Sequence, residues 1–377
     1  MKIIGNKIKI KVDRIKEETA SIENTKINTR HLAAIKAWET IRKKRLERII
    51  KENRPLEFYK FYKNMRYVSY GSYKINPPLI KPSKLTFKDK GGVGKELSDG
   101  YALNFAIGCT HACRFCYVDS IHKRFTLPRL NTDIIAKSWG MYLLIPENIE
   151  EAIALTPWHK WKGKEVMLSS THDPYLPELA GIARRILEVS LPAGVRYCIQ
   201  TRSLLVRNDF DLLTKYKEQV RLQVSIATLD KELASIIEPR VALPDARLRL
   251  LREAKSKGLK VGVIIAPIFP VKGWLNDLED IFKELASIGV DNVYGEILHV
   301  RGSNLEYLKE VGLLNDDLNN NNNKKKNELL RFDRLVGKHF NAFMHRYNMK
   351  GEYWYEHYCY SSTPTTTFTS PTTTAGC

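Results

Sequence analysis

The sequence lacks any apolar segment long enough to cross a membrane, because no run of about 18 apolar residues occurs in its 377 residues. Its N-terminus, MKIIGNKIKIKVDRIK, alternates cations with isoleucine instead of forming the uninterrupted apolar stretch of a secretory signal. These absences predict a cytoplasmic protein without a membrane partner.

Cysteine is also scarce, with six in the whole chain, which is too few for a disulfide scaffold in a protein of this length. Three of them fall within eight residues, and the other three are scattered at Cys198, Cys359 and Cys377. The local cluster indicates a metal site, whereas the scattered cysteines are too isolated to indicate a second one.

Acidic residues are few in the first hundred residues, where 25 Lys and Arg face 11 Asp and Glu and supply +14 of the net charge of +19. A basic segment attracts polyanions by neutralising phosphates, and aromatic side chains among the cations, such as Trp38 and Tyr62, can stack on bases. We therefore consider nucleic acid as a partner of residues 1–100. Packing of the same residues onto the rest of the protein is an equal alternative.

The composition divides the chain into four segments. We expect a basic helix and extended arm over residues 1–98, a catalytic domain over 99–302, a low-complexity loop followed by a helical and aromatic segment over 303–360, and a disordered Thr-rich tail over 361–377. The N-terminal helix begins near residue 30 and ends before Pro55.

Short β-branched runs alternate with amphipathic stretches between about residues 100 and 300. The strands expected from this pattern are 102–108, 165–171, 196–201, 221–227, 260–266 and 292–298. Six strand–helix repeats predict parallel strands with right-handed crossovers, and hence an α/β fold with a partial (β/α)6 TIM-like barrel. A doubly wound sheet is the structural alternative. In such a barrel the chemistry lies at the C-terminal ends of the strands.

The sequence GCTHACRFCYV places Cys109, Cys113 and Cys116 in a C-x3-C-x2-C array directly after the first expected strand. Spacings this short let one loop surround an iron–sulfur cube, with each thiolate on a different iron, and three thiolates for four irons leave one iron open to a substrate. A zinc site that also uses His111, or a redox pair of two of the cysteines, remains an alternative.

The array, with Tyr117 after its last cysteine, resembles the radical S-adenosylmethionine (radical SAM) superfamily and, within it, the spore photoproduct lyase-like (DNA repair photolyase-like) branch. Further matching segments are STHDPYLPEL, TRSLLVRNDFDLL, QVSIATLD and EPRVALPDARLRLLREAKSKGLKVGVIIAPIFP. The resemblance implies a 4Fe-4S cluster on the three cysteines. It also implies reductive cleavage of S-adenosylmethionine to a 5'-deoxyadenosyl radical, and a reductant such as flavodoxin or ferredoxin.

The resemblance also assigns residues to cofactor binding. It places Thr171, His172 and Asp173 in the strand-two stretch near the methionine amino group, and Arg202 where the family has a lysine near the carboxylate. Ser225 matches a serine that contacts the cofactor on strand four. Read without the family, the same residues are a turn, a surface arginine and a buried serine that needs a partner.

Three further cofactor positions come from the strand ends. Glu238 and Arg240 follow strand four, where an arginine suits a carboxylate or phosphate, and an ion pair between the two is the alternative. Ala266 begins the segment APIFP at the end of strand five, against the adenosine site that the resemblance implies.

Departures from the family bear on catalysis. Ser170 stands where the spore photoproduct lyase has the cysteine that donates hydrogen to the product radical, and a hydroxyl cannot replace a thiol in that role. Phe115 replaces one tyrosine of the family's proposed relay, while Tyr117 keeps the other. We therefore expect a lyase- or transferase-like enzyme that does not repair spore photoproduct.

Three functions are consistent with these patterns. The first is a radical SAM enzyme of unassigned substrate, with nucleic acid favoured by the basic segment. The second is radical SAM modification of a protein or small molecule. The third, from another class, is a zinc-bearing nucleic-acid-binding protein without catalysis.

Overall fold

The computed structural model describes residues 68–83, 94–130, 137–299, 304–310 and 322–355. All of them belong to one compact unit, Met65–Cys377. The expected N-terminal helix, the Thr-rich tail, Cys359 and Cys377 lie outside the described residues. Within the described part of the chain, no helix is both long and apolar enough to cross a lipid bilayer.

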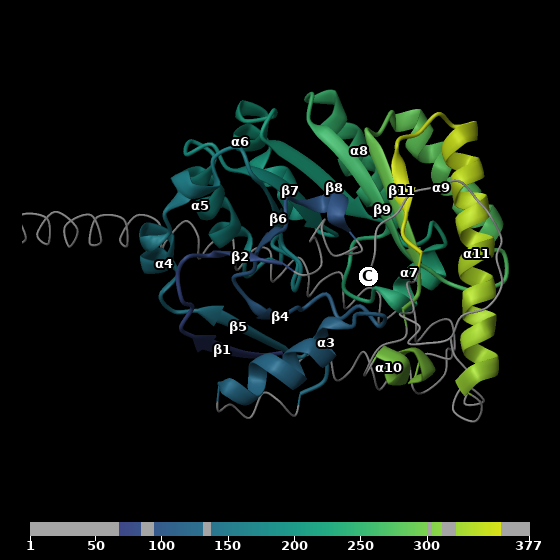
Figure 1. Ribbon diagram of the computed structural model, residues 1–377, viewed down its shortest axis with the longest axis horizontal. Helices are drawn as coiled ribbons and strands as arrows, with labels where there is room; N and C mark the ends of the chain where they lie inside the picture. Colours follow the sequence, from purple (N-terminus) through teal and green to yellow (C-terminus); the bar gives the residue numbers. More distant parts are fainter. Residues whose placement is uncertain (1–67, 84–93, 131–136, 300–303, 311–321, 356–377) are drawn as a thin grey trace, which may run out of the picture. The chain divides into compact units, whose positions relative to one another are not determined.

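An eight-stranded sheet forms the centre of this unit, in the order β11-β10-β9-β8-β7-β6-β3-β2 (Figure 1). The strands are β2 (Ile80–Pro82), β3 (Tyr101–Leu103), β6 (Glu165–Leu168), β7 (Arg196–Thr201), β8 (Val220–Ser225), β9 (Lys260–Ile268), β10 (Asn292–Ile297) and β11 (Gly351–Tyr353). All neighbours pair in parallel except β2 and β3. The sheet stays open between β11 and β2 among the described strands, which confirms the α/β fold with a partial, unclosed barrel.

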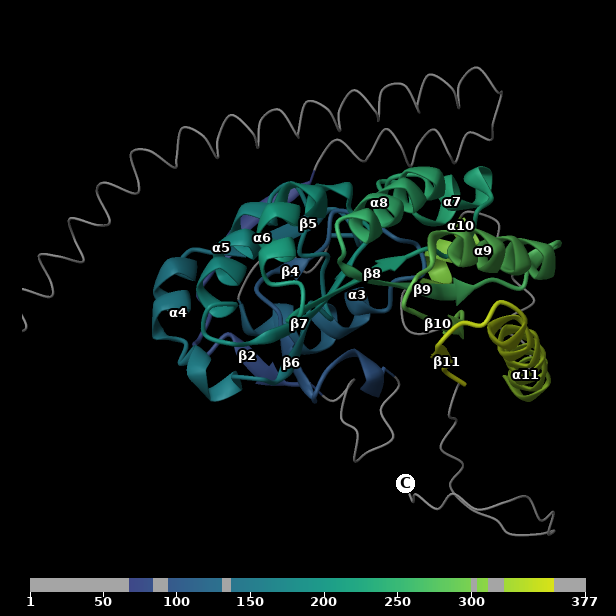
Figure 2. The same cartoon turned by 90° about the horizontal axis from the view of Figure 1, so that it is seen from above.

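The helices are α4 (Ile149–Leu155), α5 (Ala180–Ser190), α6 (Phe210–Lys215), α7 (Lys231–Ile237), α8 (Pro244–Ser256), α9 (Trp274–Ile288), α10 (Asn304–Glu310) and α11 (Asn322–Arg346). Most of them connect successive strands of the sheet, whereas α10 contacts the cysteine-containing loop through Asn304 and α3 (Val118–Ile121) through Tyr307. Figures 1 and 2 show α5, α6 and α8 along the same side of the sheet. In α9 the buried residues Leu278, Ile281 and Leu285 follow helical spacing, as expected for a helix with one apolar face.

The first expected strand, 102–108, is wrong as a single element. The chain leaves the main sheet after β3, and Ile107–Gly108 forms β4, which pairs with β5 (Tyr142–Pro146) in a second sheet that also contains β1 (Ser69–Tyr73). Gly108 has φ +92°, and a Cβ there would lie 2.4 Å from the Tyr142 carbonyl oxygen. The alternation of apolar residues could not reveal this change of direction, because it depends on a close backbone contact.

The low-complexity run was also expected to be a loop, but from Asn322 onward it forms the beginning of α11. Farther along this helix, Phe340 packs edge-on against Phe282 of α9 with ring centroids 5.1 Å apart. Aromatic burial of this kind stabilises the C-terminal part of the helix. The expectation that the C-terminal aromatic segment packs on the barrel is therefore confirmed for Phe340.

Candidate active site

A cavity of about 490 Å³ lies at the C-terminal ends of the parallel strands. Its wall includes residues that follow or end β6, β7, β8 and β10, and the loop that carries the three clustered cysteines. Of the residues singled out from the sequence, those lining it are Cys109, His111, Cys113, Phe115, Cys116, Tyr117, Ser170, Thr171, His172, Asp173, Arg202, Ser225 and Ala266. The fold therefore brings segments that are far apart in the chain to one place.

The three cysteines come from the loop between β4 and α3 (Val118–Ile121). Cys109 and Cys113 are buried, Cys116 is partly buried, and all three are free thiols. Burial raises the pKa of Cys109 and of Cys116 to about 12. Without a metal the thiols are therefore neutral at pH 7, and a bound cation is the factor that would stabilise them as thiolates.

The side chains of Arg240 and Asn304 donate hydrogen bonds to backbone carbonyl groups in and beside this loop. The guanidinium of Arg240, only 2% exposed, donates to the carbonyl oxygens of Thr110 at 3.2 Å and Gly140 at 2.6 Å. The Asn304 side chain donates to the carbonyl of Phe115 at 2.9 Å. Arg240 is not among the cavity-lining residues, so its contacts position the cysteine loop, and its predicted contact with the cofactor remains a prediction.

We expect Gly140→Ala to disturb the cysteine loop. Gly140 has φ +83°, and an added Cβ would lie 2.2 Å from the Cβ of Ala112, between two of the cysteines. Left-handed strain and overpacking together should lower the free energy of unfolding by about 2 kcal/mol or more. Denaturant unfolding and iron content after anaerobic reconstitution measure the two effects.

Gly163→Ala is the matched control, because Gly163 has φ +74° but the described segments place no atom within 4 Å of the added Cβ. This variant should show only the backbone strain, about 1 kcal/mol, and should bind iron like the wild type. Equal iron loss in both variants would contradict the steric argument.

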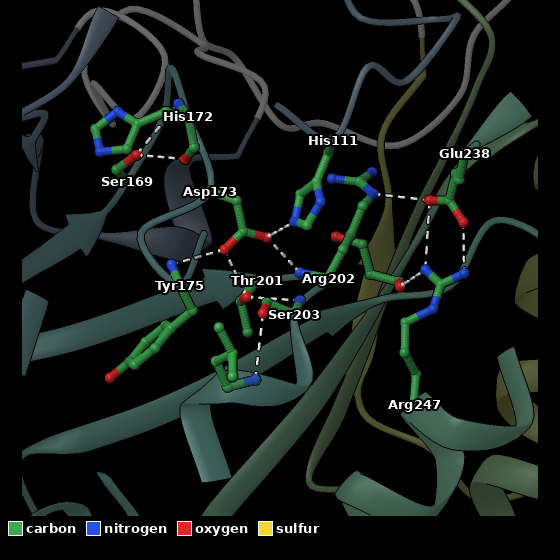
Figure 3. A network of polar contacts seen from close by, with 12 residues as sticks. His111, Ser169, His172, Asp173, Tyr175, Thr201, Arg202, Ser203, Glu238 and Arg247 are labelled. Atoms are coloured by element: carbon green, nitrogen blue, oxygen red, sulfur yellow. Dashed lines mark hydrogen bonds and ion pairs between the residues drawn. The ribbon is translucent and has the colours of Figure 1, made fainter. Parts of the chain in front are cut away.

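Asp173 follows β6 and joins three parts of the site (Figure 3). Its carboxylate accepts hydrogen bonds from the Thr201 hydroxyl at 2.7 Å and the Arg202 backbone N–H at 2.7 Å, and it contacts His111 Nε2 of the cysteine loop at 3.0 Å. Burial by itself would raise the pKa of Asp173, but His111 and the hydrogen bonds hold it below its usual value. The carboxylate therefore links the cysteine loop to the end of β7.

The residues before Asp173 are arranged by Asn104, which sequence reasoning missed. Asn104 Oδ1 accepts from the backbone N–H of Ser170 at 2.8 Å, and its amide donates to the Ser170 hydroxyl at 2.9 Å. Burial lowers the pKa of His172 to about 3, so its imidazole is neutral at pH 7. Its buried Nε2 has no hydrogen-bond partner among the described residues, and His172 lines the cavity, which is what a ligand-binding position would show.

Arg202 and Glu238 form a buried ionic network with Arg247, which is 0% exposed (Figure 3). Arg202 Nε donates to Glu238 Oε1 at 2.8 Å, and both terminal nitrogens of Arg247 bond to the same carboxylate. Glu238 thus pairs with Arg202 and Arg247, and the described contacts include no pair between it and Arg240. It lies behind the cavity wall, where it orients the Arg202 guanidinium that lines the cavity.

Sequence reasoning also missed Gln200, Glu296 and His299, which line the cavity beyond the predicted residues. His299 Nε2 lies 3.0 Å from Glu296 Oε2, and the buried amide nitrogen of Gln200 has no hydrogen-bond partner within the described part of the chain. Gln200 and Glu296 lie near the C-terminal ends of their strands, and that placement is the signal that could have found them.

The donor set fits a cluster with three protein ligands. Three free thiols line one cavity, together with the unpartnered nitrogens of His172 and Gln200. Among the described residues, no three Cys, His, Asp or Glu side chains are close enough to share a single metal ion. In a 4Fe-4S cluster each thiolate binds a different iron. The three cysteines therefore need to line the same cavity, but they do not need to converge on a single metal ion.

Comparison with known proteins agrees with this geometry. Residues 103–285 match the family model described as the radical SAM superfamily. An uncharacterized protein of Acidianus two-tailed virus, ORF301, is 58% identical over 305 residues, which cover 80% of this chain and 98% of the viral protein.

Two spore photoproduct lyases are more distant. The lyase of a Geobacillus species (strain Y412MC61) is 24% identical over 193 residues, covering 49% of this chain and 51% of the lyase, so the chain spans about half of that relative. A solved mutant lyase with bound AdoMet and dinucleoside spore photoproduct superposes with a TM-score of 0.53 at 17% identity, covering 76% of this chain and 82% of that one. At this identity the structural similarity establishes the fold.

Proposed function

The chain belongs to the radical SAM superfamily, and from this membership we propose that it is an enzyme that binds a 4Fe-4S cluster and S-adenosylmethionine. The observation that supports this most directly is the position of Cys109, Cys113 and Cys116 on the same cavity wall as the polar ends of β6, β7 and β8. When bound, the reduced cluster supplies the electron that cleaves S-adenosylmethionine to methionine and a 5'-deoxyadenosyl radical, which abstracts hydrogen from the substrate.

The chain's own residues bind and orient in this proposal. Arg202, held by Glu238 and by the Ala266 carbonyl at 3.2 Å, presents a guanidinium suited to the methionine carboxylate. The neutral imidazole of His172 offers Nε2 for one hydrogen bond, and Ser225 offers a hydroxyl at the end of β8. Both residues face the cavity that would hold the cofactor.

The substrate-side residues argue against repair of spore photoproduct. Ser170 lines the cavity, and its hydroxyl is bound by Asn104, which leaves an O–H where that reaction needs an S–H hydrogen donor. Tyr117 directly follows Cys116 and also lines the cavity. We propose it as a second catalytic residue. We propose nucleic acid as the substrate class because of the basic residues 1–100, with a protein or small molecule as the alternative.

The test is an anaerobic assay of 5'-deoxyadenosine. Protein reconstituted with iron and sulfide, reduced with dithionite and mixed with S-adenosylmethionine should form 5'-deoxyadenosine and methionine in equal amounts. A confirmed 4Fe-4S cluster that yields neither product would contradict the proposal. Stoichiometric zinc without labile sulfide after anaerobic purification would support the non-catalytic zinc protein instead.

The proposal also includes the electron donor and the cellular location. Radical SAM enzymes need a reductant, and we propose a flavodoxin or ferredoxin as the physiological donor. We also propose a cytoplasmic location, because free thiols persist in a reducing compartment.

A further inference from the structure

A continuous helical segment follows the last cysteine of the loop. It consists of α3 (Val118–Ile121), the π-helical turn η4 (His122–Thr126) and the short 3-10 helix η5 (Leu127–Arg129). One side of this segment is buried, with Val118, Asp119, His122 and Leu127 turned into the protein. The opposite side exposes Ile121, Arg124, Phe125 and Arg129, which together we call the α3 face.

The segment adjoins the cavity. Val118 lines the cavity directly. Trp139 also lines it and stacks on His122 of η4, with ring centroids 6.2 Å apart. The α3 face is therefore the exposed side of a helical segment that begins at Val118, two residues after Cys116.

Two large apolar side chains are exposed on this face, Ile121 at 37% and Phe125 at 52%. The Arg124 guanidinium lies over the Phe125 ring, 5.1 Å from its centroid. An exposed aromatic ring with an arginine beside it is the combination enriched in protein–protein interfaces. The side chain of Ile121 is apolar and has no group that could bind a nucleic-acid phosphate.

The charge around these apolar residues is positive. Arg124 and Arg129 are both exposed. The one acidic residue between positions 118 and 129 is Asp119, which is 0% exposed and accepts hydrogen bonds from Lys123 and Tyr307. The face therefore presents cations to solvent without a neighbouring exposed carboxylate on the same segment, and it is complementary to an acidic partner.

We propose that the α3 face is the docking site of an acidic one-electron carrier protein. This inference rests on the proposed function, since it assigns the place where the electron enters. The carrier would give up one electron to the cluster that Cys109, Cys113 and Cys116 would hold, and no covalent bond would form or break. The apolar pair supplies the centre of the interface, and the arginines supply steering and register.

The test uses a flavodoxin as the probe, with the double variant Arg124→Glu/Phe125→Ser. In the first measurement, immobilised cluster-free protein binds flavodoxin, and the variant should bind at least about 10-fold more weakly than wild type because it reverses a charge and removes an interface aromatic. Wild-type affinity should fall as salt rises, and the variant should lose part of this dependence.

The second measurement compares two reductants on the reconstituted enzyme. With flavodoxin, its reductase and NADPH, the variant should form 5'-deoxyadenosine at least about 10-fold more slowly. With dithionite, a small molecule that needs no docking surface, its rate should equal that of wild type. The matched control is Lys257→Glu/Leu155→Ser, which changes an exposed cation and an exposed leucine that precede β9 and β6, at the opposite end of the strands.

Each outcome decides between the explanations. Unchanged flavodoxin affinity in the α3-face variant, or an equal loss in the control, would overturn the docking proposal. Unchanged flavodoxin affinity together with weaker DNA binding would assign the face to nucleic acid. Absence of 5'-deoxyadenosine from wild type with dithionite would count against the proposed function, while the binding measurement on cluster-free protein would still test the surface.

Discussion

Replacing Cys113 with alanine should abolish 5'-deoxyadenosine formation, to below about one hundredth of the wild-type rate. Cys113 is 6% exposed and lies in the centre of the cysteine loop, where loss of one of three thiolates leaves two irons without a protein ligand. Arg240 holds the start of this loop through its hydrogen bond to the Thr110 carbonyl oxygen. Iron, labile sulfide and product are measured on the same anaerobic sample.

Cys198→Ala provides the matched control. Cys198 is also a fully buried free thiol, and burial raises its pKa to about 12, but it packs among Met167, Ile264 and Tyr294 inside the sheet. It should retain the cluster and at least half of the activity. Retention of iron and product by Cys113→Ala would contradict the assignment of the cluster, and their loss from Cys198→Ala would show a general effect of removing a buried thiol.

Glu238→Gln should lower the free energy of unfolding by about 3–5 kcal/mol, the typical result of removing one partner of a buried ion pair. Glutamine keeps the shape of the side chain but leaves Arg247, with a side-chain exposure of 1%, as an uncompensated buried charge. Glutamine has one acceptor oxygen where the carboxylate has two, so the hydrogen bond that orients Arg202 at the cavity would also be weakened. Denaturant unfolding measures the loss of stability. Equilibrium binding to the reconstituted protein should show a weaker affinity for S-adenosylmethionine, because Arg202 is less well oriented.

The same network makes stability depend on pH. Burial by itself would raise the pKa of Glu238, but Arg247 and Arg202 hold it below its usual value. The stabilisation is therefore fully present above the ordinary carboxyl pKa and is lost as the pH falls through the lowered one. Wild type should lose this part of its stability in acid, and Glu238→Gln should not.

Glu284→Gln is the control for this charge removal. Glu284 pairs with Arg252 on the surface, with side-chain exposures of 41% and 46%, and exposed pairs contribute at most about 1 kcal/mol. A loss of stability in Glu238→Gln no larger than in Glu284→Gln would contradict the buried-pair explanation.

Most of the sheet could be predicted from the sequence because each buried strand is an apolar run followed by an amphipathic stretch. The expected strand 196–201 corresponds to β7 (Arg196–Thr201), and the expected strand 260–266 lies within β9 (Lys260–Ile268). The edge strands β2 and β11 have three residues each, too few for any periodicity to show. They form because neighbouring strands offer them backbone partners.

The cysteine array was determined by the sequence itself, since ligands that one short loop provides are set by spacing along the chain. The partners of Asp173 and Glu238 were decided by the tertiary structure. Asp173 meets His111 from 62 residues away, and Glu238 meets Arg202 from 36 residues away. Spacing along the chain predicts such contacts only within one element, and a parallel sheet brings together strand ends that are separated by whole helices. The fold alone therefore decided that Arg240 supports the cysteine loop and that Asn104 arranges Ser170.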